Sequence, residues 1–303
     1  MAKLLLMSLL ICNVAIPAKF AASPPSKPKE AMIENIEYWS NAADDTFPTR
    51  LTVARSGSAE LEVASNDGDP LGPNIGHFSM ELEPRAFELL AKAVADTAFL
   101  QHANPGPVEP GEVIRRMRVR FSNGREVRRF VQGSAPVDAG FARAEQAALR
   151  LAAETRRHPT DALALAATLS QGAGRDDMVI DVTITNVGSN AVAVPHPDHW
   201  AESGMAFHLS VRRKDVPLAE MSNEHQTFLE LGREALVSVP ALTAAQVTIQ
   251  PGQRQVLSFG VHLPLSPGRY EAWGALLVRL FAENGNAIML GELLSTRLPI
   301  VRK

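Results

Sequence analysis

The sequence predicts a small α+β domain, an antiparallel sheet with two helices, followed by an all-β sandwich. Two strand-like runs flank Asn123-Gly124, and apolar residues recur at helical spacing within residues 84–98 and 138–157. From Met178 onwards, strand patterns separated by turn signals replace the helical spacing. Strands grouped with helices, and then strands alone, indicate two domains of different class.

Residues 1–22 have the features of a secretory signal peptide. Lys3 gives a positive start, residues 4–18 are almost all apolar, and small residues follow. The apolar run is short for a stable membrane span, so we expect cleavage and an exported protein. Two alternatives stay open: an uncleaved anchor, and lipid modification of Cys12. Against the second, bulky Ile11 stands where lipoprotein signals have a small residue.

Composition limits the classes of function. Cys12 is the only cysteine of the 303 residues, so a mature protein without the signal would have no disulfide, thiol nucleophile or thiolate metal site. The net charge is −3, and −5 without Lys3 and Lys19. This mild acidity argues against a nucleic-acid binder and against a general binder of anionic membranes.

A short linker leads into the first domain. Residues 23–30, SPPSKPKE, are Pro-rich and polar, which is typical of an extended tether. The first domain is expected at residues 31–160. Alternating runs at 50–54 and 59–63 predict a hairpin, and residues 77–82 predict a third strand.

Two helices complete this domain. Pro84 suits the first turn of a helix, and apolar residues then recur at helical spacing up to Ala98. Asp138 is a candidate N-cap for a second helix that runs to about Arg157 and is stopped by Pro159.

The most distinctive local feature is a basic hairpin at residues 113–131, VIRRMRVRFSNGREVRRFV. Seven arginines stand against the single Glu126, and Asn123-Gly124 is a strong hairpin signal. One interpretation is a docking surface for an anionic partner, and the other is a solvated strand face whose arginines cover apolar surface. The residues concerned are Arg116, Arg118, Arg120, Arg128 and Arg129.

The register of this hairpin bears on the choice. A three-residue loop would place Arg120 opposite Glu126. A two-residue loop would place Arg118 opposite Arg129 and leave like charges adjacent, which would favour an anion site.

Residues 161–177 are Ala-rich and then Gly-rich, which allows a helical turn, a strand and a loop. We interpret them as a junction that leads into the second domain, residues 178–303. Met178 to Thr185 alternate in the period of a half-buried strand. Further alternating runs follow, interrupted by a long excursion at residues 222–245. Seven or so strands without a strong helix pattern are typical of a sandwich.

Part of this pattern resembles a known group. The segments 182–188 (VTITNVG), 249–252 (IQPG) and 267–270 (PGRY) resemble the strand-and-turn punctuation of bacterial immunoglobulin-like sandwiches, among which the intracellular proteinase-inhibitor family is similar. The resemblance covers residues 178–301 and implies a non-catalytic binding or inhibitory fold. The signal peptide, the front domain and the 222–245 excursion depart from that family, so inhibition of an intracellular protease is not carried over.

A histidine cluster is the best candidate for an enzyme site. His196, Asp198, His199 and Trp200 follow one another closely, and two histidines with a carboxylate would bind zinc if a third ligand folded in. Pro197 disfavours the helix that would place both histidines on one face. We therefore interpret the cluster as loop residues with Trp200 against the sandwich, available for partner binding, and expect no metal, no cofactor and no catalytic residue.

The sequence thus predicts an exported bacterial protein, periplasmic or secreted, that is not an enzyme. Its expected partner is another envelope or secreted protein, with no nucleic acid and no stable membrane span after signal removal. Inhibitor, immunity factor and envelope-complex subunit all fit this description. The alternatives are a metal-dependent hydrolase or metal-binding protein that uses the histidines and, ranked lower, a carbohydrate-binding module.

Overall fold

The computed structural model describes residues 31–42, 47–66, 72–104, 112–133, 137–217, 220, 222, 225–238 and 245–302. The predicted signal peptide (1–22) and linker (23–30) therefore lie outside the described residues. The chain divides into the units Met1–Ala31 and Met32–Lys303, and every element named below belongs to the second. No helix in the described part of the chain is long and apolar enough to cross a membrane.

The first half of this unit contains strands and three helices. These are β1 (Ile33–Ala42), β2 (Thr49–Ala54), β3 (Ser58–Val63), β4 (Asn74–Glu81), α1 (Pro84–Ala95), α2 (Thr97–Leu100), β5 (Val113–Phe121), β6 (Glu126–Gln132) and α3 (Ala139–Thr155).

The second half is almost entirely strands. Its elements are β7 (Pro159–Gln171), β8 (Asp177–Asn186), β9 (Val192–Pro195), η1 (Pro197–His199), α4 (Trp200–Ser203), β10 (Ala206–Arg213), β11 (Gln226–Leu231), η4 (Arg233–Ala235), β12 (Leu236–Ser238), β13 (Gln246–Ile249), β14 (Arg254–His262), β15 (Gly268–Ala282), β16 (Ala287–Leu294) and β17 (Leu298–Arg302).

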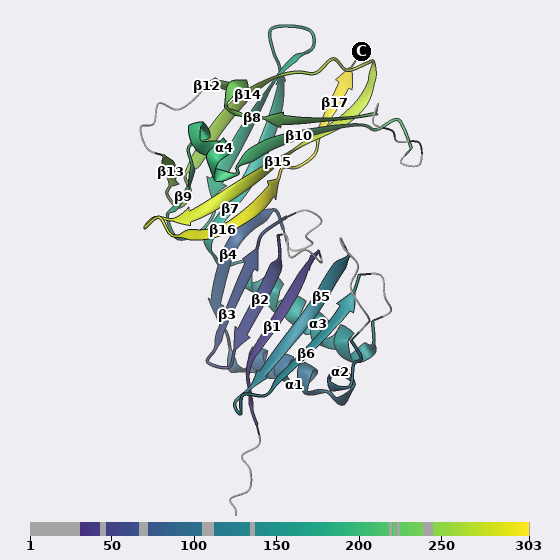
Figure 1. Cartoon of the computed structure of the whole chain (residues 1–303), viewed down its shortest axis with the longest axis vertical. Helices are drawn as coiled ribbons and strands as arrows, with labels where there is room; N and C mark the ends of the chain where they lie inside the picture. The colour runs from purple at the N-terminus through teal and green to yellow at the C-terminus, as the bar shows by residue number, and fades with distance from the viewer. Residues whose placement is uncertain are drawn as a thin grey trace, which may run out of the picture. The chain divides into compact units, whose positions relative to one another are not determined.

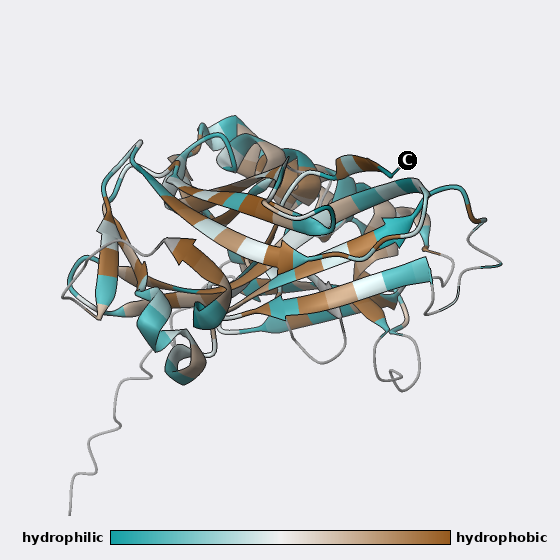
Figure 2. Ribbon diagram, turned by 90° about the horizontal axis from the view of Figure 1, so that it is seen from above, coloured by the Kyte–Doolittle hydropathy of each residue, from teal (hydrophilic) through white to brown (hydrophobic). Residues whose placement is uncertain are grey.

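Antiparallel sheets dominate the structure (Figure 1). Among the described residues, ten strands form one sheet in the order β12-β14-β8-β7-β4-β3-β2-β1-β5-β6, and seven form another in the order β11-β10-β15-β9-β13, with β16 and β17 also paired to β15. The alternation of apolar and polar residues along these strands is visible in Figure 2. Antiparallel pairing is what this alternation favours, because one face of each strand is buried.

The helices bury one face of the sheet around β1, β2 and β3. Phe87, Leu90 and Val94 of α1 are buried, and Phe99 of α2 stacks on Phe141 of α3 with ring centroids 6.2 Å apart. The opposite face of these strands bears polar and charged side chains. This uncovered face is where the candidate site lies.

A second core joins strands of the two sheets. Phe207 of β10 stacks on Phe259 of β14 with centroids 5.0 Å apart, and Trp200 of α4 lies 6.0 Å from the same ring. Val182 of β8 and Leu276 of β15 belong to the same buried cluster. The residues that alternate along β8 are thus buried as their period predicts.

Most predicted elements are confirmed. The hairpin at 50–63, the basic hairpin and the helix from Asp138 all form, and Gly124 takes the left-handed φ of +80° that its turn requires. Asp138 caps α3 by accepting a hydrogen bond of 2.8 Å from the Phe141 amide.

Three segments contain strands that the sequence did not specifically predict. Residues 33–42, for which no strand was predicted, form β1. The 161–177 segment consists largely of β7, which pairs with β4 on one side and β8 on the other. The 222–245 excursion contains β11 and β12, and its residues 223–224 and 239–244 lie outside the described part of the chain. The division into two domains stays a prediction.

Candidate functional site

The candidate site is built on the uncovered side of β1, β5 and β6. Tyr38 and Met117 point into the core and are almost fully buried, so their neighbours in sequence point the other way. We call this surface the Trp39 face. It consists of Trp39 of β1, Ile114, Arg116 and Arg118 of β5, and Arg128 and Phe130 of β6.

The register of the hairpin places like charges together. Arg120 lies opposite Glu126, as the three-residue connection predicts. The same register also places Arg118 directly opposite Arg128. Like charges directly opposite on one sheet face are destabilising, by about 0.2–1 kcal/mol. Arg120 itself is exposed.

Glu37 of β1 is the buried anion beneath these arginines, with 6% of its surface exposed. The Arg118 Nη2 donates to both of its carboxylate oxygens, at 2.7 and 2.6 Å, and the Arg50 Nη2 lies 3.4 Å from Oε2. A carboxylate this deeply buried is stable as an anion only when it is paired. Glu37 therefore fixes the position of Arg118.

Trp39 is surrounded by three guanidinium groups. The Cζ atoms of Arg116, Arg50 and Arg118 lie 4.7, 5.0 and 5.2 Å from its ring centroid. These are cation–π distances, and stacking of this kind leaves the in-plane N–H groups of a guanidinium directed to the sides. The Trp39 ring thus fixes the positions of the guanidinium groups from β2 and β5.

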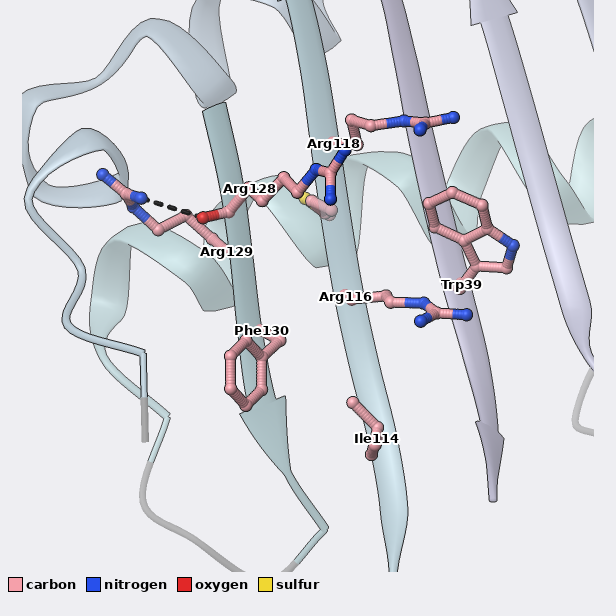
Figure 3. A pocket seen from close by; sticks show the side chains of 8 residues that line it. Trp39, Ile114, Arg116, Arg118, Arg128, Arg129 and Phe130 are labelled. Carbon is pink, nitrogen blue, oxygen red and sulfur yellow. Dashed lines mark hydrogen bonds between the residues drawn. The ribbon is translucent and has the colours of Figure 1, made fainter. Parts of the chain in front are cut away.

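A pocket of about 410 Å³ opens on the Trp39 face. Figure 3 shows Arg116 and Arg118 reaching from β5 towards Trp39, with Ile114 and Phe130 beside them. The walls of this pocket combine four arginines, Arg129 included, with apolar side chains. Such a mixture suits a ligand that carries both an apolar group and a negative charge.

Arg129 also lines the pocket, but its guanidinium makes its hydrogen bonds elsewhere. Its guanidinium donates to the carbonyl oxygens of Phe99 (3.3 Å) and Leu100 at the end of α2. Figure 3 shows it extending away from the other arginines. These contacts satisfy helix-terminal carbonyl groups and give Arg129 a structural role.

Beneath the site, β1 is tied to α3. The Tyr38 hydroxyl donates to Glu145 Oε1 at 3.0 Å, and Arg115 Nη1 lies 2.9 Å from Glu145 Oε2. Burial, and then the neighbouring carboxylate of Glu145, raise the pKa of the Tyr38 phenol well above its ordinary value. Tyr38 is therefore a permanent donor in this contact and holds β1 in register with the helix layer.

The predicted histidine cluster does not converge on a common point. The His196 side chain is buried and its Nδ1 accepts from the Asp198 amide at 3.2 Å, whereas His199 is partly exposed and pairs with Glu202 at 3.1 Å. Trp200 is 3% exposed and donates to the Pro195 carbonyl oxygen. Its burial against the sheet core agrees with the interpretation from sequence and removes the ring from the surface.

Asp198 pairs with Arg233, and its Oδ2 also lies 3.4 Å from Nδ1 of His196. Hydrogen bonding from that guanidinium lowers the pKa of the Asp198 carboxyl. Within the described residues, no group of three His, Cys, Asp or Glu side chains is placed to hold a metal ion. The metal-dependent hydrolase stays an untested alternative.

Sequence reasoning missed Glu37, Trp39 and Arg50. All three depend on β1 lying between β2 and β5, which pairs Trp39 with both Arg50 and Arg116. The signal available was the alternation of Ile36 and Tyr38 with Glu37 and Trp39. An outward tryptophan obscures it, because Trp counts as apolar in any period-two pattern.

No family model matches this chain, and no curated protein is similar to it. Among solved structures, the putative ApaA protein from Bordetella pertussis is similar to part of it, with 15% identity, 47% of this chain and 95% of that chain covered, and a TM-score of 0.29.

Two further solved structures show similarly low likeness. AvmM, described as catalysing macrocyclization in alchivemycin A biosynthesis, has 10% identity, covers 45% of this chain and 86% of its own, and has a TM-score of 0.23. BcpA, the major pilin subunit of Bacillus cereus, has 8% identity, covers 91% and 66%, and has a TM-score of 0.21. At these TM-scores none of the likenesses assigns a fold family or a function.

Proposed function

We propose that this chain is an exported, non-catalytic protein that binds an anionic surface of another protein through its Trp39 face. The observation that carries the proposal is the pocket lined by Arg116, Arg118 and Arg128 together with apolar side chains. Arginine and aromatic residues are the types enriched at the energetic centres of protein interfaces.

The finer division of the fold belongs to the same proposal. Residues 31–160 form an α+β domain and residues 178–303 an immunoglobulin-like sandwich. The helices α1 to α3 all fall within the first range, and the shared core of β8, β10, β14 and β15 in the second supports the sandwich. Export to the periplasm or the exterior rests on the signal-like residues 1–22.

The electrostatics favour an acidic partner. Arg118 and Arg128 lie directly opposite one another, so an added negative charge would relieve their repulsion. The side chain of Arg128 is 73% exposed and its pair with Glu126 lies at the surface, where such pairs contribute little. An acidic group of a partner therefore competes well for Arg128.

Capture from envelope extract tests the proposal. Three baits are compared: wild type, the double variant Arg116→Glu/Arg128→Glu, and a matched control. The control is Arg254→Glu/Arg279→Glu, which makes the same charge change at exposed positions of β14 and β15. We expect wild type and the control to recover the partner equally. The Arg116→Glu/Arg128→Glu bait should recover about tenfold less of it, or lower still. Equal recovery by all three baits would overturn the proposal.

A further inference from the structure

We propose that the pocket of the Trp39 face binds a side-chain carboxylate together with a neighbouring aromatic side chain, so that its ligand is an acidic-aromatic segment of the partner. This inference rests on the proposed function, because it names the chemistry that the docking surface recognises. It adds that the binding energy is concentrated in one pocket and requires both groups.

The carboxylate half follows from the arginines of the two strands. The Arg118 Nη2 is held by Glu37, which leaves the Arg118 guanidinium fixed in place while Arg128 projects from the neighbouring strand. Arg116 also lines the pocket. A carboxylate accepts several charge-assisted hydrogen bonds at once and matches the planar fork of a guanidinium.

Glu37 itself directs the ligand. Because it is 6% exposed and bound by two arginines, an incoming anion cannot replace it without leaving a buried charge unpaired. The partner's carboxylate must therefore bind on the solvent side, where Arg128 and Arg116 line the pocket. Glu37 pre-organises the site by holding Arg118 there before the ligand arrives.

The aromatic half follows from the walls. Trp39, Ile114 and Phe130 line the same pocket, and inorganic phosphate or a lone carboxylate would leave them in contact with water. The volume of about 410 Å³ lies at the lower end of the range for small-ligand pockets, which suits one or two side chains. An aromatic ring adjacent to the carboxylate fills this space.

The shape favours the interior of a chain over a free chain end. The lining residues follow β5 from Ile114 to Arg118 and β6 from Arg128 to Phe130, so the pocket is an open groove along two strands. A passing segment lies in such a groove, whereas the capture of a terminal carboxylate by a protein commonly uses a nest of backbone amides.

Four N-acetylated dipeptides distinguish the contributions of the side-chain carboxylate, the aromatic ring and the chain end. The probes are N-acetyl-Asp-Phe-amide, its neutral counterpart N-acetyl-Asn-Phe-amide, N-acetyl-Asp-Ala-amide without the ring, and N-acetyl-Asn-Phe with a free carboxyl end. The chain has three tryptophans, so the indole N–H signals in an NMR titration report Trp39 separately from Trp200 and Trp273. We expect the first probe to shift Trp39 alone and to bind about tenfold or more tighter than the other three.

Paired variants test the residues. Arg128→Gln and Trp39→Leu should each weaken the first probe about fivefold or more, whereas Arg297→Gln and Trp273→Leu should leave its affinity unchanged. Urea unfolding of each variant shows whether it is folded. Because Arg128 is exposed, its variant keeps the test valid if Trp39→Leu fails to fold.

The outcomes separate the two proposals. Equal binding of the Asp-Phe and Asn-Phe amides, or tighter binding of the free chain end, would overturn this inference. If no dipeptide binds while partner capture still depends on Arg116 and Arg128, the pocket chemistry is wrong and the docking surface stands. If partner capture does not depend on those arginines, the proposed function is wrong, whether or not the dipeptides bind.

Discussion

Two strands from different halves of the chain carry the same short arrangement, a glutamate and a tryptophan separated by one residue. On β1 these are Glu37 and Trp39, and on β15 they are Glu271 and Trp273. Each glutamate is 6% exposed and each tryptophan is contacted by arginines. Period two places both residues of each pair on the same outward face.

The two clusters use their cations differently. Glu271 accepts hydrogen bonds from Arg212 and from Arg297 at 2.6 Å, and Lys214 lies 3.6 Å from its other oxygen. The arginines at Trp273 thus converge on the carboxylate beside them. At Trp39, Arg118 is bound to Glu37, while Arg128 lies opposite Arg118 and faces a pocket.

Under the proposed function, one arrangement serves two purposes. A buried carboxylate encircled by cations holds strands together when all the cations converge on it. The same carboxylate becomes the base of a binding surface when a further arginine is added across from a cation that is already paired. Sites of this kind retain local repulsion that a structural cluster would remove.

The largest expected difference comes from removing each carboxylate. Glu271→Ala leaves three cations without their anion and should lower the free energy of unfolding by about 3 kcal/mol. Glu37→Ala leaves two, one of them beside an open pocket, and should cost about 1.5 kcal/mol. Urea unfolding at neutral pH measures both.

Glutamine at each position is the control, because it keeps the volume and one acceptor oxygen. We expect Glu271→Gln and Glu37→Gln to lose less than the alanine variants. A cost for Glu37→Ala equal to or above that of Glu271→Ala would contradict the contrast between the two clusters.

The sequence predicts elements well where one face is buried and the other polar. β8 and the basic hairpin follow period two closely, and the hairpin turn is marked by Asn123-Gly124, so both were predicted. β1 was missed because its outward face is unusual. That face carries a large apolar ring, Trp39, and a carboxylate that is buried, Glu37. The alternation of apolar and polar residues along one strand cannot reveal an apolar ring on the outward face.

The candidate site was predictable in part for the same reason. Arg116, Arg118 and Arg128 stand out in the sequence, whereas their neighbours Arg50 and Glu37 join them only through the pairing of β1 with β2 and β5. Pairing between distant strands depends on the whole sheet and leaves no local trace. Arg128 and Arg129 are adjacent in β6 and point to opposite faces, so Arg129 lies opposite Met117 and its guanidinium contacts the end of α2.

Acid should weaken the β15 cluster in a defined pH range. Burial alone would raise the pKa of the Glu271 carboxyl, but hydrogen bonds from Arg212 and Arg297 outweigh it and lower that pKa. A lowered pKa in the folded state means that the stabilisation is present above the unfolded-state pKa of about 4.3 and disappears as pH falls through the folded-state value.

The measurement is urea unfolding of wild type and Glu271→Gln over a series of pH values. Their difference in unfolding free energy should be constant near neutral pH and should shrink below about pH 4. Glu60→Gln, at an exposed position of β3, serves as the control and should run parallel to wild type. A difference that stays constant into acid would show that Glu271 gains nothing from its charge.

The smallest expected effect is a change in unfolding free energy that has opposite signs in the two clusters. Arg128→Gln removes the charge opposite Arg118 and should raise the free energy of unfolding by about 0.5 kcal/mol at low salt, whereas Arg297→Gln should lower it by about 1 kcal/mol. The gain should vanish at high salt, because Arg128 is 73% exposed and its repulsion is screened. An arginine whose removal stabilises the fold is retained for another reason, and binding of an anion is the reason proposed above. If Arg128→Gln instead destabilises the protein as Arg297→Gln does, both clusters are structural and the Trp39 face loses its distinction.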